Sequence, residues 1–326
     1  MGEARNACLA NKDMLQYIAK RFVSLIVVMF LVAALVFFLT RLAPGDPAAI
    51  MLGDQATAED VERLREVYGL DKPVLVQFGL WLKEIAQGNL GRSIFLQQPV
   101  GSALLDRAEL TFFLTIFAVS IAAAIGIPAG IASAVWRGRA VDQIVSGLAM
   151  LAANIPSFWL GLIFIQLFAV RLGWFPVAGY GPPGAGLIER LSYLMLPAAV
   201  LGIVNSALIT RFTRASMLDV LDNDYIRTAR SKGLSEWRVV MRHAFGSALI
   251  PIVTVVGLTA ALMIGGAIVT ETVFGLPGIG NLVVSAVLRR DYPVIQGALI
   301  VVAAIYVLIN LAIDLLYAAI DPRVRY

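Results

Sequence analysis

The chain has 326 residues, of which 59% are hydrophobic and 15% are charged, a balance typical of a membrane protein. Its formal net charge of +4 is too small to favour nucleic-acid binding, so the lysines and arginines are better explained as residues that fix orientation in a bilayer. Cys8 is the only cysteine, so no disulfide can form within the chain. It follows no apolar run, which argues against a cleaved signal or a lipid-attachment site.

Six apolar stretches are each close to the roughly 20 residues that a helix needs to cross a bilayer. None of them contains Asp, Glu, Lys, Arg or His, and prolines inside them are tolerated as kinks or first-turn residues. The sequence therefore predicts an all-α integral membrane protein with six transmembrane helices. The predicted spans are 22–40, 110–136, 143–170, 191–210, 248–270 and 294–313.

The distribution of basic residues predicts the orientation of these spans. With the N-terminus in the cytoplasm, 15 of the 26 lysines and arginines lie inside, and four lie in the two short outer loops. The remaining seven lie between the first two spans, in a segment longer than the loops over which this charge rule acts. We therefore expect both termini in the cytoplasm.

The long outer segment after the first span is expected to be helical. Thr57 and Asp60 have the spacing of a capping signal, and an apolar face follows them. Pro73 can open a second helix that ends near Gly88. This segment predicts a small helical cap over the outer membrane face. The expected regions are 1–108 with the first span and this cap, 109–318 with five spans and a cytoplasmic loop at 211–247, and a cytoplasmic tail at 319–326.

The loop at 211–247 is the most cationic part of the chain, with seven lysines or arginines. Asp222, Asn223 or Asp224 can cap a helix, and Gly233 stands where a helix often ends in a left-handed residue. Ser235 and Glu236 can then begin a second helix. The pattern predicts a helix, a glycine turn and another helix between two spans.

Several chemistries lack the residues that they need. None of the five lysines follows a glycine, which excludes a P-loop and thus ATP hydrolysis of that type in this chain. One histidine, His243, and one cysteine do not make a metal centre. Spans without ionisable groups argue against ion-coupled transport. Neutral polar residues are more often helix-to-helix contacts, but Asn154, Ser157 and Asn205 are the candidates for lining a path.

Residues 224–234, DYIRTARSKGL, resemble the EAA loop of bacterial binding-protein-dependent ABC permeases, and more narrowly the B-type permease of the dipeptide, oligopeptide and nickel importers. Further stretches with the same resemblance follow one another in the family's order over nearly the whole chain. They are RLAPGDP at 41–47, YGLDKP at 68–73, GNLGRS at 88–93, IPSFW at 155–159, ExxFxxPGIG at 271–280 and RDYP at 290–293. Arg227 and Thr228 replace the Glu and Ala of the general EAA pattern, and the distance from Gly233 to Pro251 is longer than usual, both as in the peptide subfamily.

The resemblance implies a type I ABC importer permease fold and a role for each motif. The helix ending at Gly233 would be the coupling helix, with Ala229 as its packing contact and Arg230 and Lys232 as polar contacts to an ATPase groove. The implied coupling residues are Asp224, Tyr225, Arg227, Ala229, Arg230, Lys232 and Gly233. The outer loop at 271–280 would contact a binding protein, and its implied residues are Glu271, Phe274, Pro277 and Gly278.

The resemblance also implies the partners. They are a second homologous permease subunit, two cytoplasmic ABC ATPases that would hold ATP and magnesium, an extracytoplasmic solute-binding protein and the bacterial inner membrane. Catalytic residues, cofactors and metals are not expected in this chain. Di- or oligopeptides are the first expected solutes, with nickel chelates, glutathione, opines and sugars as alternatives in the same family. A stand-alone facilitator or channel, or a membrane scaffold or enzyme subunit, would be the alternatives outside it.

Overall fold

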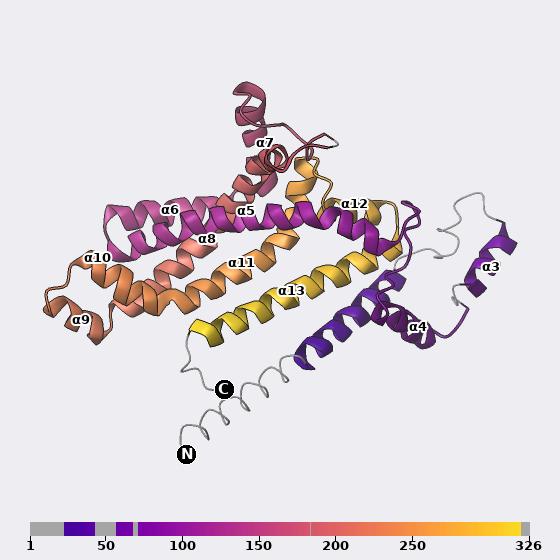
Figure 1. The fold of residues 1–326 in the computed structure, drawn as a ribbon, viewed down its shortest axis with the longest axis horizontal. Coiled ribbons are helices and arrows are strands. Elements are labelled where there is room, and N and C mark those ends of the chain that lie inside the picture. Colours follow the sequence, from indigo (N-terminus) through magenta and orange to yellow (C-terminus); the bar gives the residue numbers. More distant parts are fainter. Residues whose placement is uncertain (1–22, 43–56, 68–70, 183, 321–326) are drawn as a thin grey trace, which may run out of the picture. The chain divides into compact units, whose positions relative to one another are not determined.

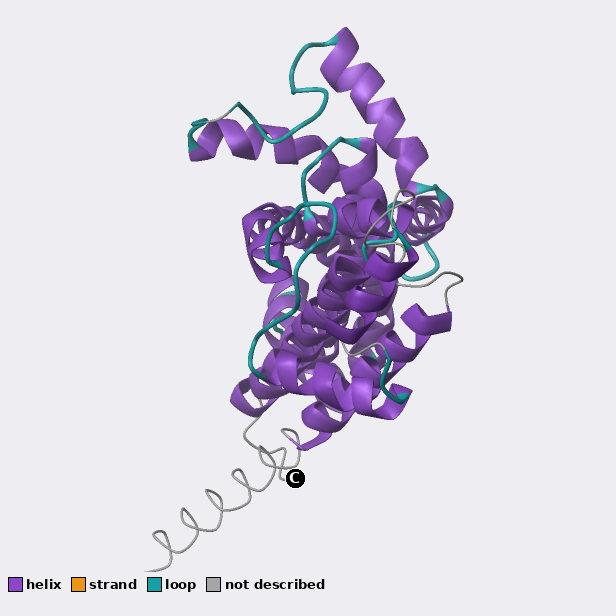
Figure 2. Ribbon diagram, turned by 90° about the vertical axis from the view of Figure 1, so that its right-hand side faces the viewer, coloured by secondary structure: helices purple, strands orange, loops and turns teal. Residues whose placement is uncertain are grey.

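The computed structural model describes residues 23–42, 57–67, 71–182 and 184–320, and these residues form helices and loops (Figures 1 and 2). Both tails and parts of two motifs, 43–47 and 68–70, lie outside the described residues. The described chain groups into two compact units, one from residues up to 108 with Leu282–Leu308, the other from Glu109–Asn281 with residues after 308. The predicted regions concern membrane topology and stay predictions.

The six predicted spans each correspond to a helix or to a bent pair of helices that is long and apolar enough to cross a membrane. The helices extend past the predicted ends because charged residues continue the same helix beyond the apolar stretch. They are Val23–Leu42, α5 (Val100–Val135), α6 (Ala140–Asn154) with α7 (Ser157–Phe164) and η1 (Ile165–Arg171), α8 (Leu187–Leu221), α10 (Glu236–Arg238) with η2 (Val239–Ala244) and α11 (Phe245–Val273), and α13 (Tyr292–Ile320).

The third span is bent by 97° between its two halves, at one of the prolines that the sequence allows as a kink. The break lies at Ile155 and Pro156, which have extended ψ angles of 123° and 128°. Proline disfavours a helical conformation in the residue before it, so the break falls where the sequence places Pro156.

In the first unit, α3 (Ala58–Val67) begins with the expected capping box. The Asp60 amide donates to the Thr57 hydroxyl at 3.2 Å, and the Thr57 amide donates back to the Asp60 carboxylate at 3.3 Å. Hydrogen bonds from Thr57 also lower the pKa of Asp60. This confirms the capping signal read from the sequence.

The next helix, α4 (Val74–Ala86), packs against the side of the first span rather than across its end. The Phe78 ring lies 5.9 Å from that of Phe30 and 5.2 Å from that of Phe37, and the Trp81 ring lies 5.3 Å from Phe37. These aromatic contacts hold α4 beside the first span, and the helical cap over the outer membrane face stays a prediction.

A buried carboxylate fixes the segment after α4 to the turn before α13. The Ser93 hydroxyl donates to Asp291 at 2.6 Å and the Phe95 amide donates at 3.1 Å, and both Ser93 and Asp291 are buried. The Arg289 guanidinium lies 3.5 Å from the centre of the Phe95 ring. Two of the motifs read from the sequence, at 88–93 and 290–293, are therefore in direct contact, through Ser93 and Asp291.

In the second unit, α8 packs against α6 and α11, and close contacts with α5 depend on glycine. A Cβ atom on Gly126 would collide with Ile209, and one on Gly130 would collide with Thr213. Small residues let helix backbones approach closely in a membrane protein, where apolar burial alone does not favour one contact over another. The core of this unit includes Leu114, Leu194, Leu201, Ile209 and Met263.

Candidate functional site

The helix α9 (Asp224–Ser231) lies at one end of the long helices α8 and α11, in the segment that joins them (Figure 1). Its Ile226 and Ala229 side chains are buried in a cluster with Met217 of α8, Val239 of η2 and Ala248 of α11. The other residues of α9 are exposed. The helix is therefore fixed along one apolar side and presents its polar side outward.

The end of α9 has the glycine turn that the sequence predicts. Gly233 has a φ of 76°, in the left-handed region that favours glycine. Its amide donates to the Arg230 carbonyl at 2.9 Å, and the Leu234 amide donates to the Ala229 carbonyl at 3.5 Å. This pair of bonds is the Schellman arrangement, which satisfies carbonyls that a helix end would leave open.

The start of α9 differs in one detail from expectation. Asn223 is the residue that precedes the helix, but its side chain does not accept a bond from the helix amides, and its amide donates instead to the Asp219 carbonyl at 3.2 Å. Asp224 is the first helical residue, where a negative charge suits the helix dipole. Ser235 then precedes α10, as expected.

Polar contacts fix the two ends of this segment. The Tyr225 hydroxyl donates to the Ser247 hydroxyl of α11 at 3.0 Å. Arg230 forms an ion pair with Glu236 of α10 at 2.7 Å. The guanidinium that was expected to contact the ATPase therefore already has a carboxylate partner within this chain. Arg227 pairs with Asp224 at 3.3 Å, while Lys232 is exposed and has no ion-pair partner among the described residues. The role of all these residues in ATPase docking stays a prediction.

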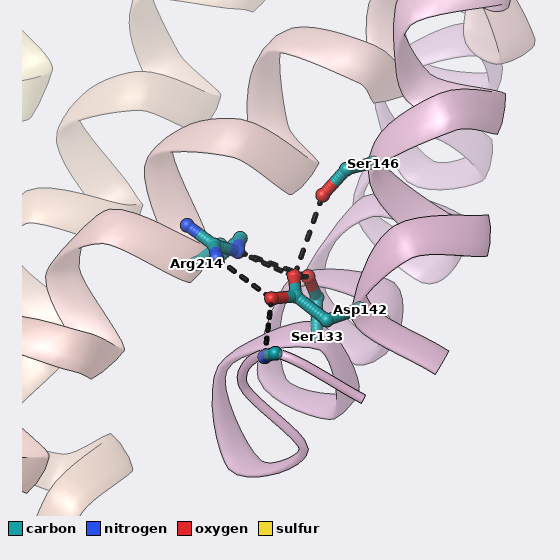
Figure 3. Close-up of polar contacts among 5 residues, drawn as sticks. Ser133, Asp142, Ser146 and Arg214 are labelled. Atoms are coloured by element: carbon teal, nitrogen blue, oxygen red, sulfur yellow. Dashed lines mark hydrogen bonds and ion pairs between the residues drawn. The ribbon is translucent and has the colours of Figure 1, made fainter. Parts of the chain in front are cut away.

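An ion pair between a buried carboxylate and a partly buried guanidinium, which the sequence did not predict, lies in the same unit (Figure 3). Arg214 of α8 holds the Asp142 carboxylate of α6 with two bonds, Nε to Oδ1 at 2.7 Å and Nη2 to Oδ2 at 2.9 Å. The Ser133 hydroxyl of α5 and the Gly138 amide donate to the same carboxylate at 2.5 and 2.9 Å. Burial of a carboxylate has a large desolvation cost, which the two bonds from Arg214 and the further hydrogen bonds offset.

The sequence contains no local pattern that predicts the pairing of Asp142 with Arg214. Arg214 counts as one more basic residue of the cationic loop, and Asp142 lies just before the expected third span. The two are 72 residues apart, and only the packing of α6 on α8 brings them together.

A further buried carboxylate, Glu271, organises the loop between α11 and α12 (Ile279–Leu288). The Thr111 hydroxyl of α5 donates to it at 2.8 Å, and the Asn281 amide of α12 donates at 2.9 Å. The Ile279 amide donates in turn to the Thr111 hydroxyl at 3.0 Å. A Cβ atom on Gly278 would collide with the Glu271 carboxylate, which explains a glycine at that position.

The same loop contains the residues assigned to a binding-protein contact. Gly275 has a φ of 57° and ends α11 in the same type of turn as Gly233. Glu271 and Phe274 are buried, so their side chains shape the loop from inside, and Pro277 is exposed. A contact between this loop and a binding protein stays a prediction. Because Glu271 and Phe274 are buried, their side chains stabilise the loop from within.

The three residues proposed to line a path are not brought together by hydrogen bonds. Asn154 donates to the Met150 carbonyl at 2.7 Å, and Asn205 donates to the Leu201 carbonyl at 2.8 Å, each within its own helix. Ser157 begins α7, directly after the break at Pro156. Their role in a path stays a prediction.

Comparison with known proteins identifies the family of this chain. Residues 126–326 match the family described as binding-protein-dependent transport system inner membrane component, and residues 14–115 match the N-terminal part of such membrane components. The chain belongs to this family. It is the permease subunit of an ABC importer, and the all-helical fold with its apolar spans is that of a multi-pass inner membrane protein.

Relatives align with the permease over almost its whole length. A Brucella abortus protein named "Putative peptide transport system permease protein" is 46% identical over 309 residues, which cover 95% of this chain and 98% of the relative. The Escherichia coli glutathione transport system permease protein GsiC is 42% identical over 313 residues, 96% of this chain and 100% of the relative.

A solved structure supports the fold. The MetNI methionine ABC transporter in an inward-facing conformation aligns with a TM-score of 0.57 at 19% identity, over 67% of this chain and 96% of the matched chain. At this identity the similarity concerns the fold alone. It confirms the type I importer fold that the motifs predict.

We predict that Asp142→Asn destabilises the permease, because it leaves the Arg214 charge without its partner in a partly buried site. The Arg214 side chain is 32% exposed, so solvent screening reduces the loss to about 1–3 kcal/mol. The midpoint of thermal unfolding in detergent measures it. Asp222→Asn is the control, because its pair with Arg137 is 63% and 72% exposed and is expected to contribute less than about 1 kcal/mol. Equal midpoints for the two variants would contradict the role of the buried pair.

We also predict that Gly278→Ala destabilises the α11–α12 loop by about 1–3 kcal/mol, because the added methyl group takes the space of the Glu271 carboxylate. The same unfolding assay measures the loss. Gly265→Ala on α11 is the matched control, since a Cβ atom there meets nothing within 4 Å. If the two alanine variants unfold alike, the contact between Gly278 and Glu271 does not hold the loop.

Proposed function

We propose that this permease imports peptides, with di- and oligopeptides as the substrate class. The proposal is supported by the relatives that align end to end, because the one at 46% identity is named for peptide transport. The described spans carry neutral polar groups such as Asn154 and Asn205, which suit an uncharged path that several solutes can share. Selectivity would then lie mainly in the binding protein.

The observation that carries the coupling mechanism is the way α9 is held. Ile226 and Ala229 fix it to the cluster at the ends of α8 and α11, and the turn at Gly233 fixes its direction. A helix fixed in this way transmits a push as a rigid body rather than by bending. We therefore propose that α9 is the coupling helix, and that Asp224, Arg227 and Lys232 on its exposed side meet an ATPase groove.

This role implies an assembly and an orientation. The α9 end would face the cytoplasm, as would both termini, and the loop around Pro277 would face a binding protein outside. A second homologous permease and two ATPases complete the importer, and ATP with magnesium is held by the ATPases rather than by this chain. ATP-driven closure of the two ATPases would move α9 of each permease and open the path outward.

Glutathione is the second candidate solute. The permease GsiC, at 42% identity, is named for glutathione transport. Glutathione is a small anionic peptide, so the two candidates differ in the binding protein more than in the path.

The coupling proposal predicts that Gly233→Val abolishes most ATP-driven uptake, because a β-branched residue is strained at a φ of 76° and displaces the end of α9. Gly233→Asn is expected to keep most uptake, since asparagine tolerates the left-handed region. Uptake and ATPase activity of the complex in proteoliposomes measure the effect. Gly246→Val, at the start of α11, is the control because a Cβ atom there meets nothing within 4 Å. Normal uptake by Gly233→Val would contradict the proposal.

The substrate proposal predicts saturable uptake of a labelled dipeptide by cells that express the complete importer. Unlabelled di- and tripeptides are expected to compete, and free amino acids and sugars are not. Competition by glutathione alone would favour the second candidate. Competition by a nickel chelate or a sugar, with none by peptides, would refute the peptide class.

A further inference from the structure

The outward side of α4 is the surface whose role is still unexplained. Val74–Leu82 contains no charged residue, while Lys72 precedes this run and Lys83 follows it. Leu75 is 75% exposed, and Val76 and Leu80 are 47% and 44% exposed. An apolar face of this kind on a helix in water would be unfavourable, so its surroundings need to be identified.

The contacts of α4 with the first span place it at membrane depth. In the sequence, Lys20–Arg21 and Arg41 bound the apolar run that crosses the bilayer. With a rise of about 1.5 Å per residue, Phe37 lies about 8 Å and Phe30 about 18 Å from the Leu42 end of that helix. The Phe78 ring touches the rings of both, at 5.2 and 5.9 Å. Its depth therefore falls within the hydrocarbon region rather than above it.

The rest of the helix fits a position at the edge of the acyl chains. Trp81, a residue that prefers the membrane–water interface, is partly exposed beside Phe37. Lys72 and Lys83, one before and one near the end of α4, can extend their amines toward headgroups while their aliphatic stems stay among apolar groups. The first span itself exposes Leu31, Leu35 and Leu39 by 59, 59 and 55%, as a lipid-facing helix does.

We infer that α4 is an interfacial membrane helix whose face of Leu75, Val76 and Leu80 is buried in the acyl chains of the leaflet at the Leu42 end. In the orientation proposed above this is the outer leaflet. A helix of 13 residues is too short to span a bilayer, but it is long enough to lie along one leaflet. It anchors the segment between the first span and α5 to the membrane.

Spin labels at Leu75→Cys and Leu80→Cys, in a Cys8→Ser background, test this in the complete importer reconstituted into phosphatidylcholine liposomes. Collision rates with oxygen, which concentrates in lipid, and with a water-soluble nickel chelate report what surrounds each label. Arg63→Cys on α3 is the matched control, because the Arg63 side chain is 72% exposed on a polar helix. Oxygen collisions are expected to exceed nickel collisions several-fold at positions 75 and 80, and the reverse is expected at position 63.

Two outcomes would overturn the inference. Labels at 75 and 80 that meet the nickel chelate as often as the one at 63 would place α4 in water. Labels shielded from both probes would show that a protein partner covers this face. Lipids with nitroxides at different depths provide a second readout, since only an inserted helix brings a fluorophore at position 80 within their reach. These measurements do not depend on transport, so they can fail while the proposed function stands, and uptake by each labelled variant verifies that it is folded.

Discussion

Backbone hydrogen bonding in hydrocarbon is the constraint on which this structure depends. Without water, every N–H and C=O group at membrane depth needs a partner within the protein, and a helix supplies those partners from its own backbone. The chain therefore crosses the bilayer as helices and changes direction where glycine or proline permits it. Gly233 and Gly275 end helices in the same hydrogen-bonded turn, and Pro156 marks the bend of 97° in the third span.

Buried carboxylates supply the specificity that apolar packing lacks in a membrane. Asp142, Glu271 and Asp291 each accept hydrogen bonds from a segment far away in the sequence, at separations of 72, 160 and 198 residues. A lipid-facing helix can slide against another apolar helix at little cost, whereas a buried carboxylate is satisfied in one register only. We interpret these carboxylates as the contacts that fix each loop to the ends of the neighbouring helices. A displacement of one helix end would then move the loop and the helix bound to it.

The α9 segment shows how local chemistry supports a mechanical role. An apolar side at Ile226 and Ala229 holds the helix, the pair of Arg230 and Glu236 ties it to α10, and its remaining polar side is exposed. This division between a fixed and an exposed side supports the coupling role that we propose for the loop with its seven basic residues. Three of them, Arg214, Arg227 and Arg230, pair with carboxylates of the same chain.

The sequence by itself determined the helical class, the number and order of the spans, the family, the capping box at Thr57 and the turn at Gly233. The family followed from the resemblance of the motifs, and the other features follow from composition, apolar length and local backbone preferences, which act over a few neighbouring residues. Tertiary structure decided the rest, namely the partner of Arg214, the burial of Glu271 and Phe274, and the position of α4 beside the first span. Such contacts join residues that are distant along the chain, and their energies depend on which helix faces meet, so no local pattern could specify them.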